Sequence, residues 1–107
     1  MPREQDHYAK RARSEGYPAR SVYKLEEIDK RFSIIKKGAR VLDIGASPGS
    51  WSMYAAKSVG RGGHVVGVDL QDEKPDLPEK SFTFIRGDAF TDPVLDKIRN
   101  LGPYTCL

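Results

Sequence analysis

Residues 41–51 read Val-Leu-Asp-Ile-Gly-Ala-Ser-Pro-Gly-Ser-Trp, a short apolar run followed by a loop that contains two glycines. An apolar run of this length, closed by glycine, is typical of a strand that is buried on both faces of a parallel sheet. A helix is expected to follow, with Ser47 as its cap and Pro48 in its first position, where the missing proline N–H would have no partner anyway. The segment therefore predicts a strand, a loop and a helix in succession.

The segments on either side of this unit continue the alternation of helices and strands. Apolar side chains recur at helical spacing within residues 22–32, and Pro18 suits the first turn of that helix. Buried strands are predicted at residues 64–69 and 82–86, and a further helix at residues 92–101. Alternation of this kind predicts an α/β fold with a doubly wound parallel sheet, in which right-handed crossovers give the strand order 3-2-1.

The positive charge is concentrated in the first part of the chain. The 107 residues hold 18 Lys and Arg against 15 Asp and Glu, a net charge of +3. Residues 1–40 hold 11 basic and 6 acidic side chains, whereas residues 41–107 hold 7 and 9. Residues 1–16 are polar and are expected to form an arm or a frayed helix. A basic leading segment favours docking to a polyanion such as nucleic acid, although a solvated helix face with surplus lysines explains the charge equally well.

The composition excludes several classes of protein. No run of 18 apolar residues is present, so neither a transmembrane helix nor a membrane partner is expected. The first residues contain no apolar segment of the kind that a secretion signal needs. Cys106 is the single cysteine, which excludes an internal disulfide framework and a multi-cysteine zinc site. We therefore expect a cytoplasmic protein without a bound metal.

The glycine loop fits one nucleotide-binding pattern better than the others. A dinucleotide-binding loop has the pattern Gly-x-Gly-x-x-Gly, which fails here because Ser47 and Ser50 occupy two of its glycine positions. No Gly-Lys-Ser or Gly-Lys-Thr closes the loop, so it is not a P-loop. The remaining pattern is Asp-x-Gly-x-x-x-Gly, formed by Asp43, Gly45 and Gly49, which is typical of proteins that bind S-adenosylmethionine (SAM). An ordinary tight turn remains the alternative.

Two aspartates follow the next two predicted strands. Asp69 ends the strand at residues 64–69, about 20 residues beyond the glycine loop, where an acidic side chain can accept hydrogen bonds from ribose hydroxyls. Asp88 follows residues 82–86 and is expected at the same edge of the sheet, where it can accept from an adenine amino group. Either aspartate alone is also a common turn or cap residue. Such residues at three consecutive strand ends favour a single ligand site.

Three segments of the chain resemble the FtsJ/RrmJ-like 2′-O-ribose RNA methyltransferases. They are Asp-His-Tyr at residues 6–8, Gly-Tyr-Pro-Ala-Arg-Ser-Val-Tyr-Lys-Leu-Glu-Glu-Ile at residues 16–28, and Gly-Ala-Ser-Pro-Gly-Ser-Trp at residues 45–51. Ser50 replaces the second glycine that the family usually has. The resemblance implies a Rossmann-like SAM-dependent methyltransferase fold and an enzyme that methylates RNA, with large-subunit ribosomal RNA as the expected substrate. Transfer RNA and capped RNA, which relatives methylate, remain alternatives.

The resemblance also implies roles for individual residues. SAM, which the reaction converts to S-adenosylhomocysteine (SAH), would be contacted by Gly49, Trp51, Asp69 and Asp88 beside Gly45 of the loop. Lys24 would be the first of the family's four catalytic residues, Lys-Asp-Lys-Glu, and it lies at the border of the apolar face of its predicted helix. The RNA phosphates would be contacted by Lys10, Arg11, Arg13 and Arg20.

The patterns divide the chain into two parts. Residues 1–38 form the expected RNA-docking arm and helix, and residues 39–107 the first half of a SAM-binding domain. Family members continue with a strand that ends in Asp and with later Lys and Glu residues. We therefore expect a chain that is truncated after the third strand and its helix, is inactive by itself, and self-associates through the open edge of residues 41–44. A non-catalytic SAM- or RNA-binding module remains an alternative, as does half of a NAD-dependent enzyme.

Overall fold

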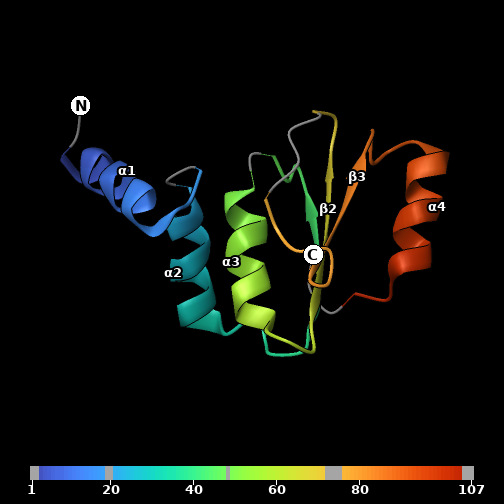
Figure 1. Ribbon diagram of the computed structural model, residues 1–107, viewed down its shortest axis with the longest axis horizontal. Helices are drawn as coiled ribbons and strands as arrows, with labels where there is room; N and C mark the ends of the chain where they lie inside the picture. The colour runs from blue at the N-terminus through green and yellow to red at the C-terminus, as the bar shows by residue number, and fades with distance from the viewer. Residues whose placement is uncertain (1–2, 19–20, 48, 72–75, 105–107) are drawn as a thin grey trace.

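The structure is a computed structural model that describes residues 3–18, 21–47, 49–71 and 76–104 of the chain. Within these ranges, its centre is a three-stranded parallel sheet with helices on both faces (Figure 1). The molecule measures 43 × 28 × 23 Å and is elongated because the N-terminal helix extends beyond the sheet and its flanking helices. The predicted α/β fold is therefore confirmed.

The described residues form seven elements in the order that the sequence predicts. The helices are α1 (Arg3–Glu15), α2 (Val22–Phe32), α3 (Ser50–Val59) and α4 (Asp92–Leu101). The strands are β1 (Arg40–Ile44), β2 (His64–Asp69) and β3 (Phe82–Arg86), in the spatial order β1-β2-β3. The bounds of β2, β3 and α4 equal the predicted ones, and the polar leading segment contains a regular helix. None of these helices is both long and apolar enough to cross a membrane.

Side chains on β2 alternate between the two faces of the sheet, and each face has its own core. Val65 belongs to a cluster with Val59 of α3, which covers one face. Val66, the next residue, belongs to a second cluster with Val94 and Ile98 of α4 on the opposite face. Burial of these apolar side chains holds both helices to the sheet. The carboxyl ends of the strands are left at one edge of the layered structure.

The N-terminal helices extend the helix layer that α3 begins. A third cluster of buried side chains joins Ala12 of α1 to Val22 and Tyr23 of α2, with Met53 of α3 packed against it. In Figure 1, α2 lies beside α3, and α1 lies beyond α2 at one end of the molecule. The packing therefore brings the first part of α2 next to the start of α3.

The start of α3 differs from the prediction. The helix begins at Ser50 with Gly49 as its N-cap, at φ 111°, so the prediction that Ser47 caps it is wrong. The backbone N–H of Ser47 instead donates to Oδ2 of Asp69 at 3.0 Å, which keeps Ser47 in the loop ahead of the helix. Pro48, expected in the first helical position, lies outside the described residues.

The start of α2 and the exposure of its last residue differ from the prediction. The helix begins at Val22, so Pro18 precedes it instead of occupying its first turn. Phe32, expected on the apolar face, ends the helix and is 64% exposed, whereas Val22 and Leu25 are buried. The apolar face of α2 therefore reaches the core through its first turns.

Candidate functional site

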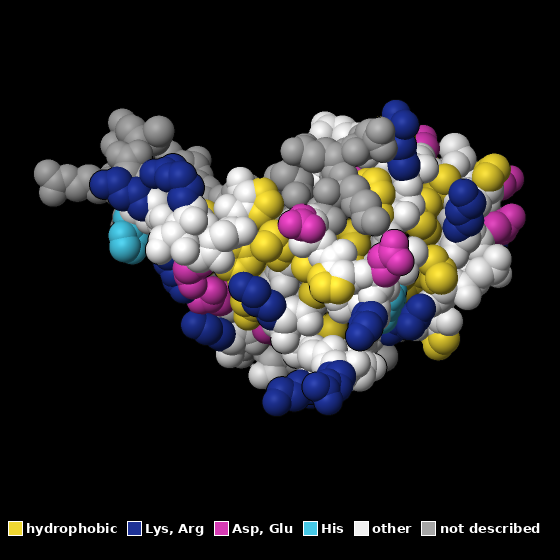
Figure 2. Space-filling model, viewed as in Figure 1, with side chains coloured by type: hydrophobic (Ala, Val, Ile, Leu, Met, Phe, Trp, Pro, Cys, Tyr) yellow, Lys and Arg dark blue, Asp and Glu magenta, His cyan; other side chains and the backbone are white. Residues whose placement is uncertain are grey.

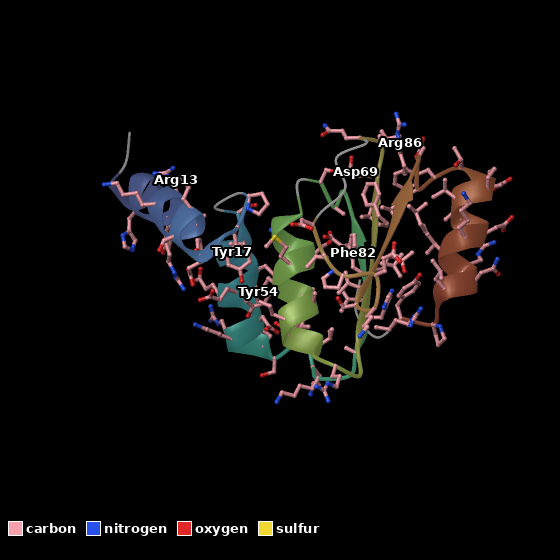
Figure 3. The ribbon with its side chains drawn as sticks, viewed as in Figure 1. Arg13, Tyr17, Tyr54, Asp69, Phe82 and Arg86 are labelled. Carbon is pink, nitrogen blue, oxygen red and sulfur yellow. The ribbon has the colours of Figure 1, made fainter. Side chains whose placement is uncertain are left out.

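The carboxyl ends of the three strands meet at one edge of the sheet and line an open cavity there. Its volume is about 200 Å³, and its lining comes from the residues that end or follow each strand. The structure thus brings Gly45, Asp69 and Asp88 together, although they are far apart in the sequence. Figure 3 shows Asp69 at this end of β2, beside Arg86 at the end of β3. Open α/β sheets bind their ligands at this position.

The two predicted glycines shape the loop between β1 and α3. Gly45 has φ 81°, and its N–H donates to the carbonyl of Val68 at 2.7 Å. Gly49 has φ 111°, and its carbonyl accepts from the N–H of Met53 at 2.8 Å in the first turn of α3. Both φ values lie in the left-handed region, which glycine adopts without steric cost. The loop therefore runs close over the end of β2 and turns directly into the helix.

Asp69 fixes this loop to the end of β2. Its Oδ2 accepts from the N–H of Ser47 at 3.0 Å, and its Oδ1 accepts from the N–H of Gln71 at 2.8 Å. Its carbonyl accepts from the N–H of Gly87 at 2.8 Å and so reaches the turn after β3. A carboxylate has about four acceptor sites, so two bonds leave others for a ligand. Asp69 therefore joins all three strand ends and still has acceptor capacity.

Asp88 organises the turn after β3, and exposed apolar side chains stand around it. Its Oδ1 accepts from the N–H of Phe90 at 2.9 Å, the local turn contact that the sequence left as an alternative. Phe90 is 88% exposed, Leu70 is 68% exposed and Ile44 is 56% exposed, and all three line the cavity. The sequence pattern did not predict this apolar wall, because Ile44 was expected inside a strand buried on both faces. The sequence signal that could have predicted the wall is an apolar side chain within two residues of each strand-end glycine or aspartate.

Asp43, the first residue of the loop pattern, is a partly buried carboxylate. Its Oδ2 accepts from Oγ of the fully buried Ser52 at 2.7 Å. Burial raises the pKa of the Asp43 carboxyl, the nearby charge of Asp69 raises it further, and the Ser52 hydrogen bond acts in the opposite direction. Across the described residues, no three His, Cys, Asp or Glu side chains are grouped so that they could hold a metal ion. The carboxylates of Asp43, Asp69 and Asp88 each accept at least one hydrogen bond.

As pH rises, the free energy of unfolding of an Asp43→Asn variant is expected to increase relative to that of the wild type. Because the pKa of Asp43 is raised in the folded state, the folded protein holds this proton at pH values where the unfolded chain has released it. The free energy of unfolding of the wild type therefore falls as pH rises through this window, and asparagine removes that contribution while keeping an oxygen for Ser52. Urea unfolding at a series of pH values checks this, with Asp96→Asn on the exposed face of α4 as the control. Identical pH profiles for Asp43→Asn and the wild type would contradict it.

Trp51 and Lys24 are not among the residues that line the strand-end cavity. The indole Nε1 of Trp51 donates to the carbonyl of Ser21 at 3.2 Å, and the N–H of Lys24 donates to the same carbonyl at 3.1 Å. The Trp51 side chain lines a second cavity of about 390 Å³, which lies between α2, α3 and the free edge of β1. The Lys24 side chain is exposed. The indole of Trp51 therefore ties the start of α3 to the start of α2, whose first turn carries Lys24.

The basic residues predicted to contact RNA have different surroundings. Lys10 and Arg13 are exposed, whereas Arg20 lies outside the described residues. The guanidinium of Arg11 pairs with Glu15 at 2.7 Å and with Glu26 at 3.2 Å. It also lies over the ring of Tyr23, 4.2 Å from the ring centre. Arg11 therefore contributes to the packing of α1 on α2.

Tyr23 completes this junction between α1 and α2. Its hydroxyl donates to Oε1 of Glu15 at 2.5 Å, and burial together with this hydrogen bond raises the pKa of Tyr23 to about 12. The same hydrogen bond, followed by the contact with Arg11, lowers the pKa of Glu15. The junction is therefore fully formed at neutral pH, where Glu15 is charged and Tyr23 is neutral.

The sequence is similar to known methyltransferases along most of its length. Residues 17–106 match the sequence profile of the family described as FtsJ-like methyltransferase. The ribosomal RNA large subunit methyltransferase E of Oleidesulfovibrio alaskensis is 52% identical over 90 residues, which are 84% of this chain and 43% of that protein. The protein of the same name from Methanobrevibacter smithii is 46% identical over 101 residues, 94% of this chain and 48% of that protein. The chain thus spans about half the length of these relatives.

Solved structures of methyltransferases share the fold. A protein from Plasmodium falciparum described as a ribosomal RNA methyltransferase superposes with a TM-score of 0.66 and 28% identity, covering 79% of this chain and 49% of that one. A MycE methyltransferase from the mycinamycin biosynthetic pathway, solved with Mg, SAH and mycinamycin VI, has a TM-score of 0.54 and 32% identity. The superposed region is 78% of this chain and 24% of the MycE chain. The expected Rossmann-like methyltransferase fold is therefore confirmed.

Proposed function

We propose that this chain, which belongs to the FtsJ-like methyltransferase family, binds SAM at the strand-end cavity and forms the cofactor-binding part of an enzyme that methylates ribose 2′-hydroxyls of RNA. One observation carries the proposal: Gly45, Asp69 and Asp88 line a single cavity at the carboxyl ends of three neighbouring parallel strands. The names of the relatives support large-subunit ribosomal RNA as the substrate. Methylation of transfer RNA or capped RNA remains the alternative.

Each wall of the cavity suits a different part of SAM. Asp69 would accept hydrogen bonds from the ribose hydroxyls through the lone pairs that its two backbone donors leave free. Asp88 would accept from the adenine amino group through Oδ2, since Oδ1 already holds the turn. The exposed side chains of Leu70 and Phe90 would cover the faces of the adenine ring. The backbone of the loop at Gly45 would lie along the amino-acid part of the cofactor.

The proposed reaction moves a methyl group from a sulfonium sulfur to a ribose oxygen. SAM supplies the methyl group and leaves as the neutral thioether SAH, while the hydroxyl proton passes to a base. The site must therefore above all hold the hydroxyl beside the methyl group. We assign to Lys24 the holding or deprotonation of this hydroxyl. Because the relatives are about twice as long, the other catalytic residues are expected outside this sequence, and the 107-residue chain alone is expected to be inactive.

Docking of RNA is proposed to use the exposed basic residues of the N-terminal part. Lys10 and Arg13 are exposed on α1 and suit contacts with phosphates. Arg11 is proposed to act through the α1–α2 junction instead, because its guanidinium is already paired with Glu15 and Glu26. Phosphate contacts of this kind give affinity that depends on salt and little on RNA sequence.

Self-association is proposed to involve the free edge of β1. Among the described strands, β1 pairs with β2 on one side and has no strand on the other. The larger cavity beside it is lined by the exposed apolar side chains of Ile28, Ile34 and Ile44. Apolar strand edges readily pair with another chain. Two copies of this chain, in the cytoplasm that the composition favours, are therefore proposed to meet at this edge.

Calorimetric titration of the chain with SAM, and separately with NAD, tests the proposed cofactor. We expect saturable binding of SAM at one site per chain and no binding of NAD, because Ser47 and Ser50 stand where a dinucleotide-binding loop needs glycine. Binding of NAD without SAM would support half of a NAD-dependent enzyme and overturn the proposal. Absence of SAM binding would overturn it as well.

A further inference from the structure

Two turns lie side by side at the amino ends of β1 and β2, at the end of the sheet opposite the strand-end cavity. The N–H of Gly38 donates to the carbonyl of Val59 at 2.7 Å, and the N–H of His64 donates to the carbonyl of Ala39 at 3.1 Å. These bonds tie the turn before β1 to the turn before β2. In Figure 1 both turns lie at the lower end of the sheet. A five-residue strand spans about 16 Å, so this end is well separated from the cavity.

Exposed cations stand on both turns. Lys36 and Lys37 lie on the first turn and Arg61 on the second, and all three side chains are exposed; we call them the turn cluster. Residues 30–40 contain five basic and no acidic side chains, and residues 57–64 contain Lys57 and Arg61 and no acidic side chain. Within the described residues, no ion pair involves the turn cluster. Figure 2 shows Lys and Arg side chains gathered along this lower edge.

The charge at the cavity end of the sheet is opposite. Asp43, Asp69 and Asp88 stand at that end, and their carboxylates repel phosphates. The acidic residue that precedes the turn cluster most closely in sequence is Asp29, whose carboxylate accepts from the N–H of Ile35 at 2.8 Å and from the hydroxyl of Tyr54 at 3.0 Å. A polyanion that approaches the sheet is therefore attracted at the turn end. Cations at the turn end can hold its backbone while another part of it reaches the cofactor.

We propose that the turn cluster is a second RNA-binding surface that contacts the phosphodiester backbone of the substrate. The proposal rests on the function proposed above, because it takes RNA as the polyanion, and it adds a surface remote from α1 and from the cofactor. An RNA that contacts both ends of the sheet must extend over more than about 16 Å. Recognition here is by charge, so the turn cluster adds affinity and orientation without reading the base sequence.

Fluorescence anisotropy with a labelled single-stranded RNA tests this on the full chain. The variant Lys37→Glu/Arg61→Glu removes two cations of the turn cluster. The control Lys97→Glu/Arg99→Glu changes two exposed cations of α4 and lowers the net charge by the same four units. We expect the turn variant to lower the slope of log affinity against log salt by about 1.4, because each phosphate contact on a single strand contributes about 0.7. The control is expected to keep the wild-type slope.

The outcomes separate the turn cluster from general electrostatics and from the cofactor site. Equal losses in both variants would mean that only net charge matters, and wild-type binding by the turn variant would mean that the turns do not touch RNA; either result overturns the proposal. Circular dichroism melting of both variants shows that each is folded at the assay temperature. Calorimetry with SAM is run on the same preparations. If the wild type does not bind SAM, the proposed function fails while the RNA comparison still decides on the turn cluster.

Discussion

Replacing Asp69 with alanine is expected to weaken SAM binding by about 10- to 150-fold. Hydrogen bonds to a charged group contribute about 1.5–3 kcal/mol, and each 1.4 kcal/mol changes a dissociation constant tenfold. The substitution removes the acceptors proposed for the ribose hydroxyls. It also removes the acceptor of the Ser47 N–H at 3.0 Å and so frees the glycine loop from the end of β2. Calorimetric titration with SAM measures the change.

Two further variants separate these contributions. Asp69→Asn keeps one oxygen, which can still accept from the N–H of Gln71, but its amide nitrogen cannot accept from the N–H of Ser47. We expect its affinity to lie between those of the wild type and Asp69→Ala. Asp96→Ala, on the exposed surface of α4, removes the same charge far from the cavity and should bind SAM like the wild type. An unchanged dissociation constant for Asp69→Ala would contradict the assignment of Asp69 to the ribose.

Replacing Gly63 with alanine is expected to lower the free energy of unfolding by about 3 kcal/mol, the upper part of the range for overpacking a core. A Cβ at position 63 would lie 2.3 Å from Cβ of Val59 and 2.7 Å from the carbonyl oxygen of Ala39. Val59 is 1% exposed and packs in the core between α3 and the sheet, so its side chain has no free space to move into. The backbone between α3 and β2 must therefore shift. Urea denaturation followed by circular dichroism measures the loss.

The neighbouring glycine supplies a matched control for this substitution. A Cβ at Gly62 would meet only Cα of Gly38, at 3.9 Å, which is an ordinary contact. Gly62→Ala is therefore expected to change stability by no more than about 0.5 kcal/mol, as is usual for surface substitutions. Both variants alter the same turn and add the same methyl group. Equal stability losses in the two variants would show that the close packing at Gly63 is not the cause.

The core elements of the fold could be predicted because their signals are local. Residues 64–69 and 82–86 are short, mainly apolar runs that end in a charged residue, and both form strands with the predicted bounds. The predicted start of α3 was wrong because the true start depends on a contact across 22 residues. This contact is the hydrogen bond from the N–H of Ser47 to the carboxylate of Asp69. Local capping preferences favoured Ser47, whereas this bond holds its backbone in the loop. Contacts of this kind have no periodicity in the sequence.

The strand-end residues of the candidate site could be predicted from the sequence, whereas the contacts between helices could not. Strand-end residues of a parallel sheet share one edge, so Gly45, Asp69 and Asp88 could be grouped from the sequence alone. The direction of the Trp51 indole, which donates to Ser21 of another helix, depends on how α2 packs on α3. The pairing of Arg11 likewise depends on the crossing of α1 over α2. Helix packing of this type follows from side-chain shapes that a motif does not contain.

Heteronuclear NMR of the ¹⁵N-labelled chain during titration with SAM tests the cofactor site most directly. Three amides report on the proposed acceptors: the N–H groups of Ser47 and Gln71 donate to Asp69, and that of Phe90 donates to Asp88. We expect these three amide signals, together with that of Gly45, to shift the most and to saturate together. The largest shifts at Ile28 and Ile34, which line the larger cavity beside β1, or no saturable shift at the strand ends, would contradict the assignment of the strand-end cavity to SAM.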